Sequence, residues 1–276
     1  MEQTYSLTEG NIGSTLLRFA IPFLLASFLQ ALYGAADLYV VGKFDTAAGV
    51  SAVAIGSQVM QTITGIVLGI STGGTVLLGR CVGERNWKAA AYAIGTIGIV
   101  FLILAMVVTP VMLLLAENIL LAMETPQEAF ASAKSYLMIC SAGIPFIVGY
   151  NAVSGIFRGL GDSKTPLYFI FLACVLNVGM DFLLVGAFHM GAAGAAIATI
   201  FAQAVSFFTA LLYMWRKGFS FPFHREYFRL NLSSALRIWK VGLPLALQDA
   251  LVNVSFLIIT TIVNTLGLIP SAAVGV

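Results

Sequence analysis

Charged residues are scarce in this sequence. Asp, Glu, Lys and Arg make up only 9% of its 276 residues, whereas hydrophobic residues make up 59%. A soluble domain contains about 25% charged residues, so this chain could not cover a water-facing surface. The formal net charge of +2 is too small to indicate a nucleic-acid partner. The composition therefore predicts an all-α, polytopic membrane protein whose surroundings are the lipid bilayer.

Cysteine pairs and catalytic motifs are missing as well. The three cysteines, Cys81, Cys140 and Cys174, are widely spaced and form no CxxC pair, which argues against a disulfide framework or a zinc site. Neither GxSxG nor HExxH is present, so hydrolase chemistry has no support. The segment GLGDSKT at 159–165 lacks the spacing of a phosphate-binding loop. We therefore expect no enzymatic activity and no cofactor.

Long apolar runs are what the sequence has instead. Each of seven runs is long enough to cross about 30 Å of hydrocarbon as a helix. Pro22, Pro110 and Pro145 fall within such runs and are expected to kink them. The seven predicted spans cover residues 15–41, 51–79, 89–115, 129–157, 166–187, 192–215 and 238–264.

Basic residues are distributed unevenly between the two sides of these spans. Twelve of the 14 Lys and Arg residues lie in the loops or at the span ends of one side, and only Lys43 and Lys134 lie on the other. The positive-inside rule then predicts a cytoplasmic N-terminus. We expect a multi-pass protein of the plasma (inner) membrane of the cell.

The first and the seventh spans begin alike. LLRFAIPFLLASFLQAL can be aligned with IWKVGLPLALQDALVNV, which matches Arg18 with Lys240 and Pro22 with Pro244. This similarity favours a parallel repeat of two six-helix halves, although proline-containing membrane helices also share composition. Because the sequence stops soon after the seventh span, we expect a truncated chain that pairs with a missing second half or with a second copy. The predicted units are a first half at 1–215, a cytoplasmic loop at 216–237 and the start of a second half at 238–276.

Two acids stand inside the six predicted spans of the first half. ALYGAADLYVVG at 31–42 contains Asp37, and LNVGMD at 176–181 ends in Asp181. A charged side chain at the bilayer centre costs at least about 2.5 kcal/mol, so acids within a membrane are functional candidates. Helical spacing places Gln30 on the face of Asp37, and Asn177 on the face of Asp181. Both acids lie toward the outer ends of their spans, where an outward-opening polar cavity would solvate them.

Further polar residues accompany these acids on neighbouring spans. Thr199 and Gln203 share a face of the sixth span, Asn151 lies in the fourth, and Tyr33 borders the face of Asp37. Such groups routinely join membrane helices through hydrogen bonds worth about 0.6 kcal/mol each. Two carboxyl groups with amide and hydroxyl oxygens can instead hold a proton or a small cation such as Na⁺. At this point both interpretations stay open.

Several segments resemble the multidrug and toxic compound extrusion (MATE) transporters. They are IPFLLASFLQALYGAADLYVVGKF at 21–44, YNAVSGIFRGLGDSKTPLY at 150–168, and LNVGMDFLLV followed by GAAGAAIAT up to residue 199. The resemblance covers essentially the whole chain. It implies twelve helices in two six-helix lobes, of which this chain supplies the N-lobe and the first helix of the C-lobe. It also implies an antiporter that exports organic cations or other amphipathic drugs in exchange for Na⁺ or H⁺.

The resemblance implies a set of site residues as well. In family members with an N-lobe cation site, the ligands match positions that the polarity argument had already singled out. We expect the coupling ion, Na⁺ or H⁺, at Asp37, Asn177, Asp181 and Thr199. The surrounding polar shell or substrate cavity is expected at Asn151, Gln30, Tyr33 and Gln203, and a hinge in the first span at Pro22 and Gly34.

Two other functions remain in view. A lipid or lipid-linked oligosaccharide flippase of the same superfamily would line its cavity with several basic residues. We expect no base in the middle of a span, with Arg18 near the entry of the first as the one exception, and this argues against a flippase. The third alternative is a non-transporting fragment.

Overall fold

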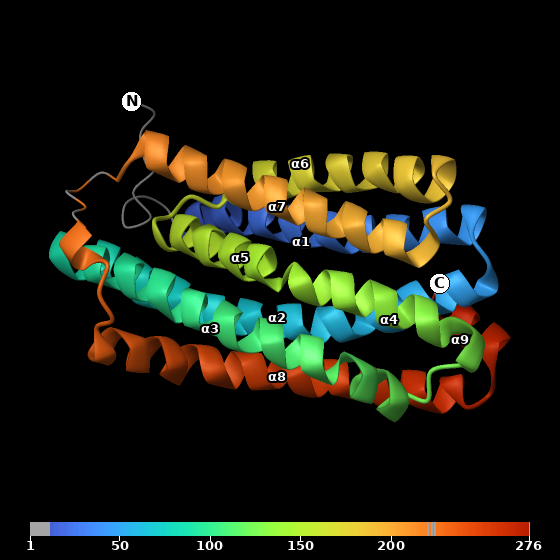
Figure 1. Cartoon of the computed structure of the whole chain (residues 1–276). Coiled ribbons are helices and arrows are strands. Elements are labelled where there is room, and N and C mark those ends of the chain that lie inside the picture. The colour runs from blue at the N-terminus through green and yellow to red at the C-terminus, as the bar shows by residue number, and fades with distance from the viewer. Residues whose placement is uncertain (1–11, 220, 222, 224, 276) are drawn as a thin grey trace.

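The chain folds into a bundle of long helices, seen in a computed structural model that describes residues 12–219, 221, 223 and 225–275 (Figure 1). The described elements are α1 (Ile12–Phe44), α2 (Ala47–Gly83), α3 (Trp87–Ala122), α4 (Gln127–Ala142), α5 (Ile144–Gly159), α6 (Lys164–Asp181), the π-helix η1 (Phe182–Ala187), α7 (Gly191–Lys217), the 3₁₀ turn η2 (Arg225–Tyr227), α8 (Leu232–Asn264) and α9 (Leu268–Gly275). The predicted all-α class is confirmed for these residues. Residues 1–11 lie outside the described part, and the cytoplasmic location of the N-terminus stays a prediction.

Seven membrane spans can be assigned to the described helices. Six helices are long and apolar enough to cross a membrane, and α4 with α5 forms a seventh span that is bent by 47°. All seven predicted spans fall inside these helices. The observed helices run a few residues further at most ends, because polar residues at a bilayer surface continue a helix without adding to its hydropathy.

The bend between α4 and α5 lies where Pro145 enters the helix. Gly143 separates the two helices, and Pro145 occupies the first turn of α5, where its missing N–H leaves no bond unmade. The sequence therefore predicted this kink correctly. By contrast, α1 and α3 continue as single helices through Pro22 and Pro110.

α6 continues as a π-helix that its sequence did not predict. The helix is α-helical up to Asp181 and continues as the π-helix η1. His189 and Gly191 then adopt positive φ angles of 54° and 55° and turn the chain into α7. Wider π-helical turns of this kind often lie at functional sites.

α2 is the central helix of the bundle and packs against α4, α5 and α8. A Cβ atom placed on Gly69 or Gly73 would collide with the backbone of α8 at Ala246 or Ile238. These two glycines therefore let the two helices approach closely, as small residues do in membrane bundles. On the other side of the bundle, α1, α6 and α7 lie together (Figure 1).

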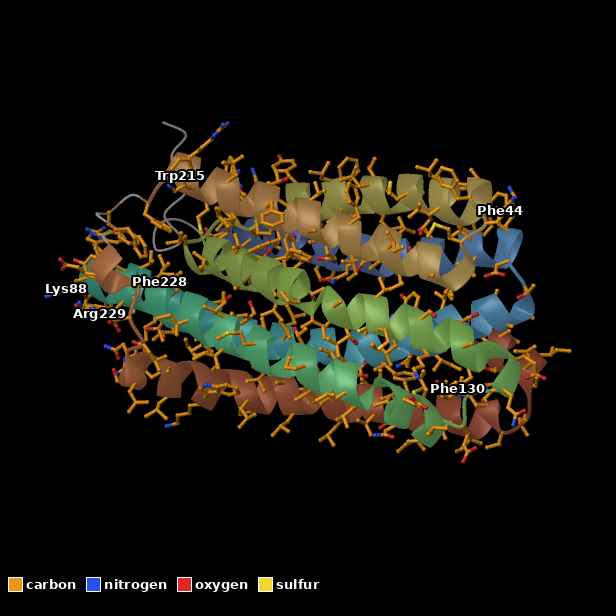
Figure 2. All side chains as sticks on the ribbon, viewed as in Figure 1. Phe44, Lys88, Phe130, Trp215, Phe228 and Arg229 are labelled. Carbon is orange, nitrogen blue, oxygen red and sulfur yellow. The ribbon has the colours of Figure 1, made fainter. Side chains whose placement is uncertain are left out.

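The segment between α7 and α8 packs on the end of α3. The ring of Phe221 stacks on that of Trp87 with centroids 5.6 Å apart, and the backbone N–H of Asn231 donates to the Thr96 hydroxyl at 3.3 Å. Figure 2 shows Trp215, Phe228, Lys88 and Arg229 at this end of the bundle, opposite the end that carries Phe44 and Phe130. α8 begins at Leu232, inside the loop predicted at 216–237, and the division into two lobes stays a prediction.

Candidate functional site

The Asp37 carboxylate on α1 is bound by a hydroxyl from α7. Thr199 Oγ1 donates a hydrogen bond of 3.0 Å to Asp37 Oδ2, and the Asn177 amide of α6 donates to Thr199 Oγ1 at 3.4 Å. Asp37 is only 4% exposed, and Asn177 is fully buried. Three helices that are distant in sequence therefore meet at one polar cluster inside an apolar bundle.

Asp181 lies in the same cluster and is fully buried. Its carboxyl group is within interaction range of the Asp37 carboxyl. Four buried oxygens of the cluster have no hydrogen-bond partner among the described residues: Asp37 Oδ1, Asn177 Oδ1, and Asp181 Oδ1 and Oδ2. Burial of an unpaired carboxylate is strongly unfavourable, so an acid pair of this kind calls for positive charge between its members.

The chemistry of this cluster suits a proton or a monovalent cation. Its donor atoms are all oxygens, from two acids, one amide and one hydroxyl. Within the part of the chain that the structure describes, no three His, Cys, Asp or Glu side chains are grouped to hold a metal ion. The cluster also lies where α6 continues as the π-helix η1, and π-helical turns are frequent at functional sites.

A second contact repeats the Asp37–Thr199 pairing one helical turn away. Gln203 Nε2 on α7 donates to the Tyr33 hydroxyl on α1 at 3.2 Å. Tyr33 and Asp37 are four residues apart, as are Thr199 and Gln203, so both pairs join the same two faces. These two contacts tie α1 to α7 beside the acid pair.

Two predicted members of the polar shell lie elsewhere. The Asn151 amide donates to the Ile147 carbonyl of its own helix at 2.8 Å, and it makes no hydrogen bond to either acid. Asn151 and Gln30 instead line a separate small cavity between α1, α2, α5 and α6. The hinge assigned to Pro22 and Gly34 stays a prediction, because α1 is a continuous helix through both.

A basic residue that the sequence analysis assigned to a loop faces this cavity. Arg158 is in the last turn of α5, lines the cavity, and donates from Nη2 to the Ser71 hydroxyl at 3.4 Å. Its guanidinium also lies 5.5 Å from the centre of the Phe23 ring. Arg158 stands at the end of its span, so the expectation that no base sits mid-span is not contradicted, but the sequence did not show that this residue faces the cavity. The spacing Asn151, Ser154, Arg158 places all three on one helical face and could have revealed it.

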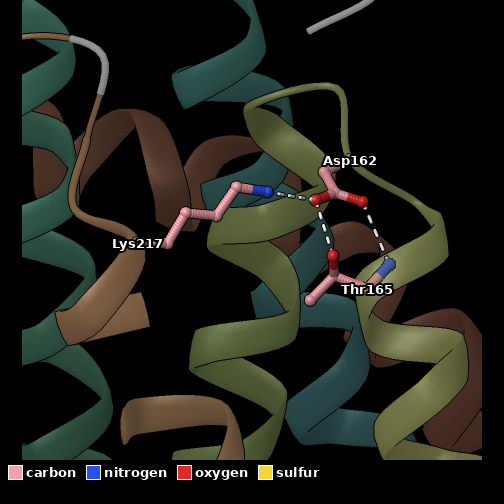
Figure 3. A network of polar contacts seen from close by, with 3 residues as sticks. All are labelled: Asp162, Thr165 and Lys217. Carbon is pink, nitrogen blue, oxygen red and sulfur yellow. Dashed lines mark hydrogen bonds and ion pairs between the residues drawn. The ribbon is translucent and has the colours of Figure 1, made fainter. Parts of the chain in front are cut away.

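In the turn after Arg158, the Asp162 side chain caps the start of α6. The Asp162 carboxylate accepts hydrogen bonds from the backbone N–H of Thr165 at 3.0 Å and from its hydroxyl at 2.6 Å, and it pairs with Lys217 at 3.3 Å (Figure 3). Burial alone would raise the pKa of Asp162, but these hydrogen bonds and the Lys217 charge lower it below its usual value. This network joins the α5–α6 turn to the end of α7.

Comparisons with known proteins agree with this architecture. A sequence model named MatE matches residues 22–183. The chain is similar to the probable multidrug resistance protein YpnP of Bacillus subtilis (strain 168), with 32% identity over 265 residues that cover 96% of this chain and 59% of YpnP. It is also similar to the multidrug export protein MepA of Staphylococcus haemolyticus (strain JCSC1435), with 21% identity over 100% of this chain and 61% of that protein. The chain therefore spans about 60% of the length of these curated relatives.

A solved structure shares the fold. An outward-facing multidrug resistance MATE family transporter of the MOP superfamily superposes with a TM-score of 0.87 and 24% identity, over 99% of this chain and 60% of that one. This likeness extends from α1 through the helices that carry the acid pair to α8.

Proposed function

This chain belongs to the MatE family, and from that starting point we propose that the protein is a cation-coupled antiporter that exports organic cations or other amphipathic drugs. The coupling ion is H⁺ or Na⁺, and the protein works in the plasma membrane. The observation that carries the proposal is the buried pair of Asp37 and Asp181 with its four unpartnered oxygens. The names of the relatives, which speak of multidrug resistance and export, support the substrate class.

Asp37 and Asp181 have the role of binding the coupling ion. A proton or Na⁺ between the two carboxyl groups neutralises their repulsion and lets α1 pack against α6 and α7. Asn177 orients Thr199, and Thr199 holds Asp37 in place. When the ion leaves, two like charges remain next to each other in a medium of low dielectric, where their repulsion is strong.

This repulsion acts on the helix that also lines the cavity. Asp37 lies on the same helix as Gln30 and Phe23, which form part of the cavity wall. A movement of α1 away from α6 and α7 therefore changes the shape of the cavity. Pro22 gives α1 a point of bending, because it removes one backbone hydrogen bond within the helix. Ion binding and substrate binding are coupled in this way.

The energetics of the coupling are sufficient for export. One elementary charge that crosses a membrane potential of 100 mV releases about 2.3 kcal/mol, which corresponds to a concentration ratio of roughly fifty. For a neutral substrate, a site that binds one cation per cycle can therefore maintain a useful drug gradient. Exchange for a monovalent organic cation moves no net charge and is driven by the concentration gradient of the coupling ion alone.

Ethidium efflux from drug-sensitive cells tests this function. Cells that express the chain are compared with cells that express Asp37→Asn and with cells that express Asp249→Asn, a control on α8 outside the cluster. Asp37→Asn should abolish the Na⁺ or pH dependence of efflux, and the control should retain it. Unchanged efflux and ion dependence in Asp37→Asn would contradict the role of this acid. Efflux no faster than from empty cells would favour the non-transporting fragment.

A further inference from the structure

We propose that the cavity between α1, α2, α5 and α6 binds the anionic head group, carboxylate or phosphate, of an amphipathic molecule, and that Arg158 is the residue that selects it. Binding at this cavity is a property of the chain itself. The step from bound ligand to exported substrate rests on the proposed function, and it limits the substrates held at this cavity to amphipathic drugs with an acidic group, in place of organic cations.

The first argument is the charge of Arg158. No carboxylate pairs with its guanidinium among the described residues, since the described ion pairs join Arg80 to Glu84, Lys134 to Glu117 and Lys217 to Asp162. Asp162, the acid closest to it in sequence, is already bound by Thr165 and Lys217. The cavity therefore carries a positive charge that the described part of the bundle does not neutralise.

The second argument is the number of unused donors. A guanidinium has five N–H groups in a planar fork that matches a carboxylate or a phosphate. Only one described hydrogen bond engages it, to the neutral Ser71 hydroxyl at 3.4 Å. The guanidinium carbon lies 5.5 Å from the centre of the Phe23 ring, a cation–π contact that restrains the side chain. An anion in the cavity would meet an oriented fork with free donors.

The third argument is independent of Arg158. The Ser154 hydroxyl also lines the cavity, is 3% exposed and has no hydrogen-bond partner among the described residues. It lies one helical turn before Arg158 on the same face of α5. A buried hydroxyl without a partner is unfavourable, and a ligand oxygen would satisfy it. Gln30, across the cavity on α1, adds a side-chain amide.

The remaining wall explains why the ligand is an amphiphile. Leu68, Ile170, Ala26 and Phe23 line the cavity with apolar groups. A small inorganic ion would leave this apolar surface uncovered. A molecule with an anionic head and an apolar body, such as a carboxylate drug or a lipid phosphate, would fill both parts.

The position of the cavity also keeps the anion away from the acid pair. Gln30 and Asp37 are seven residues apart on α1, which is about 10 Å along a helix. Phe23, beside Arg158, lies about two helical turns beyond Gln30, on the side away from Asp37. The head group therefore binds at the positive end and the coupling cation at the negative end, so the two ligands do not compete for the same residues.

Thermal unfolding of the purified chain in a neutral maltoside detergent tests the proposal. The three buried cysteines, Cys81, Cys140 and Cys174, react with a thiol-sensitive dye only when the protein opens. The probes are dodecyl phosphate, dodecanol and inorganic phosphate, each titrated against the wild-type chain, Arg158→Gln and Arg80→Gln. Arg80 is the control, because its side chain is exposed and pairs with Glu84.

We expect a saturable rise in melting temperature with dodecyl phosphate for the wild type and for Arg80→Gln. Arg158→Gln should bind at least tenfold more weakly, and Arg158→Lys should fall between them, because lysine keeps the charge and loses the fork. Ser154→Ala should weaken binding by a few-fold without loss of the folded state. If Arg158→Gln does not fold, the Arg158→Lys and Ser154→Ala titrations carry the test alone.

Three outcomes would overturn the proposal. An equal shift for Arg158→Gln and the wild type would show that the charge does not select the ligand. An equal rise in melting temperature with dodecanol would show that the cavity binds apolar chains and does not recognise an anionic head group. Saturation by inorganic phosphate with the same affinity as dodecyl phosphate would show that the apolar body of the ligand contributes nothing. Failure of the proposed function is distinct from these: a wild-type chain that binds dodecyl phosphate but shows no ion-dependent efflux would contradict only the function.

Discussion

The Thr199 hydroxyl donates a hydrogen bond of 3.0 Å to the Asp37 carboxylate, across 162 residues of sequence. This contact joins α1 to α7 at the place where α6 contributes a second acid, Asp181. Of the four oxygens of the two carboxyl groups, Asp37 Oδ2 alone has a described hydrogen-bond donor. Thr199 thus holds Asp37 in position, and the proposed coupling cation would neutralise the remaining charge.

Asp181→Asn should stabilise the chain when no coupling cation is bound. The substitution removes one of two neighbouring buried charges, which is favourable by about 1–2 kcal/mol and raises the melting temperature by about 4 °C for a chain of this size. Without Na⁺, the gain should grow as the pH rises and the second carboxyl group ionises, and it should vanish in acid, where protons neutralise both carboxyl groups of the wild type. Thermal unfolding across pH, with and without Na⁺, measures it.

Asp249→Asn on α8 is the matched control for this experiment. Asp249 lies outside the cluster, and its replacement should change neither the pH dependence nor the effect of Na⁺. If Asp181→Asn and Asp249→Asn behave alike at every pH, the acid pair is not the site of cation binding.

Thr199→Val should loosen the contact between α1 and α7. Thr199→Ser, which keeps the hydroxyl, should behave like the wild type. Valine keeps the shape of threonine but cannot donate to Asp37 or accept from Asn177. A hydrogen bond to a charged group contributes about 1.5–3 kcal/mol, so the loss should be visible in thermal unfolding.

Thr209→Val, on the same helix, is the control for Thr199→Val. The Thr209 hydroxyl donates only to the Val205 carbonyl of its own helix. This variant should retain wild-type stability and cation response. Equal effects of the two valine substitutions on stability would mean that the Asp37–Thr199 hydrogen bond contributes no more than a hydrogen bond within one helix.

Asp162→Asn should destabilise the chain at neutral pH and have no effect in acid. The pKa of Asp162 lies below its usual value, so its contribution is present above the unfolded-state pKa and is lost as the pH falls through the folded-state pKa. Loss of a helix-capping carboxylate costs about 1 kcal/mol near pH 7. Unfolding curves of both proteins should therefore converge as the pH falls through the folded-state pKa of Asp162. If the difference in stability between the two proteins were the same at all pH values, the charge of Asp162 would not be its cause.

The sequence predicted the spans and most of the acid cluster for identifiable reasons. Spans follow from hydropathy, and the neighbours of the two acids follow from helical spacing, as with Asn177 and Asp181. Contacts across helices, such as Gln203 with Tyr33, depend on how the helices rotate against each other, which spacing within one helix does not specify. The polar faces therefore identified the residues, and only the fold showed which of them meet.

Arg158 and η1 illustrate what the sequence could not supply. Arg158 lies next to the Gly-rich turn that ends α5, and charge at a span end usually indicates solvent. Its side chain points back into the bundle because α5 continues through it to Gly159. The residues FLLVGA of η1 have ordinary helical composition, so nothing in them distinguishes a π-helix from an α-helix.

Gly34→Ala separates a hinge from a packing role in α1. An added Cβ at Gly34 would meet no atom within 4 Å, so the substitution has no steric cost. Alanine also favours the helix by about 0.8–1 kcal/mol over glycine, and the chain should become slightly more stable. If α1 bends at Gly34 during transport, efflux should nevertheless fall, because the stiffened helix resists bending. Gly73→Ala is the opposite case, since its Cβ would collide with the backbone of α8 and lower stability. Wild-type efflux in a more stable Gly34→Ala protein would exclude the hinge at this position and leave Pro22 as the point where α1 bends.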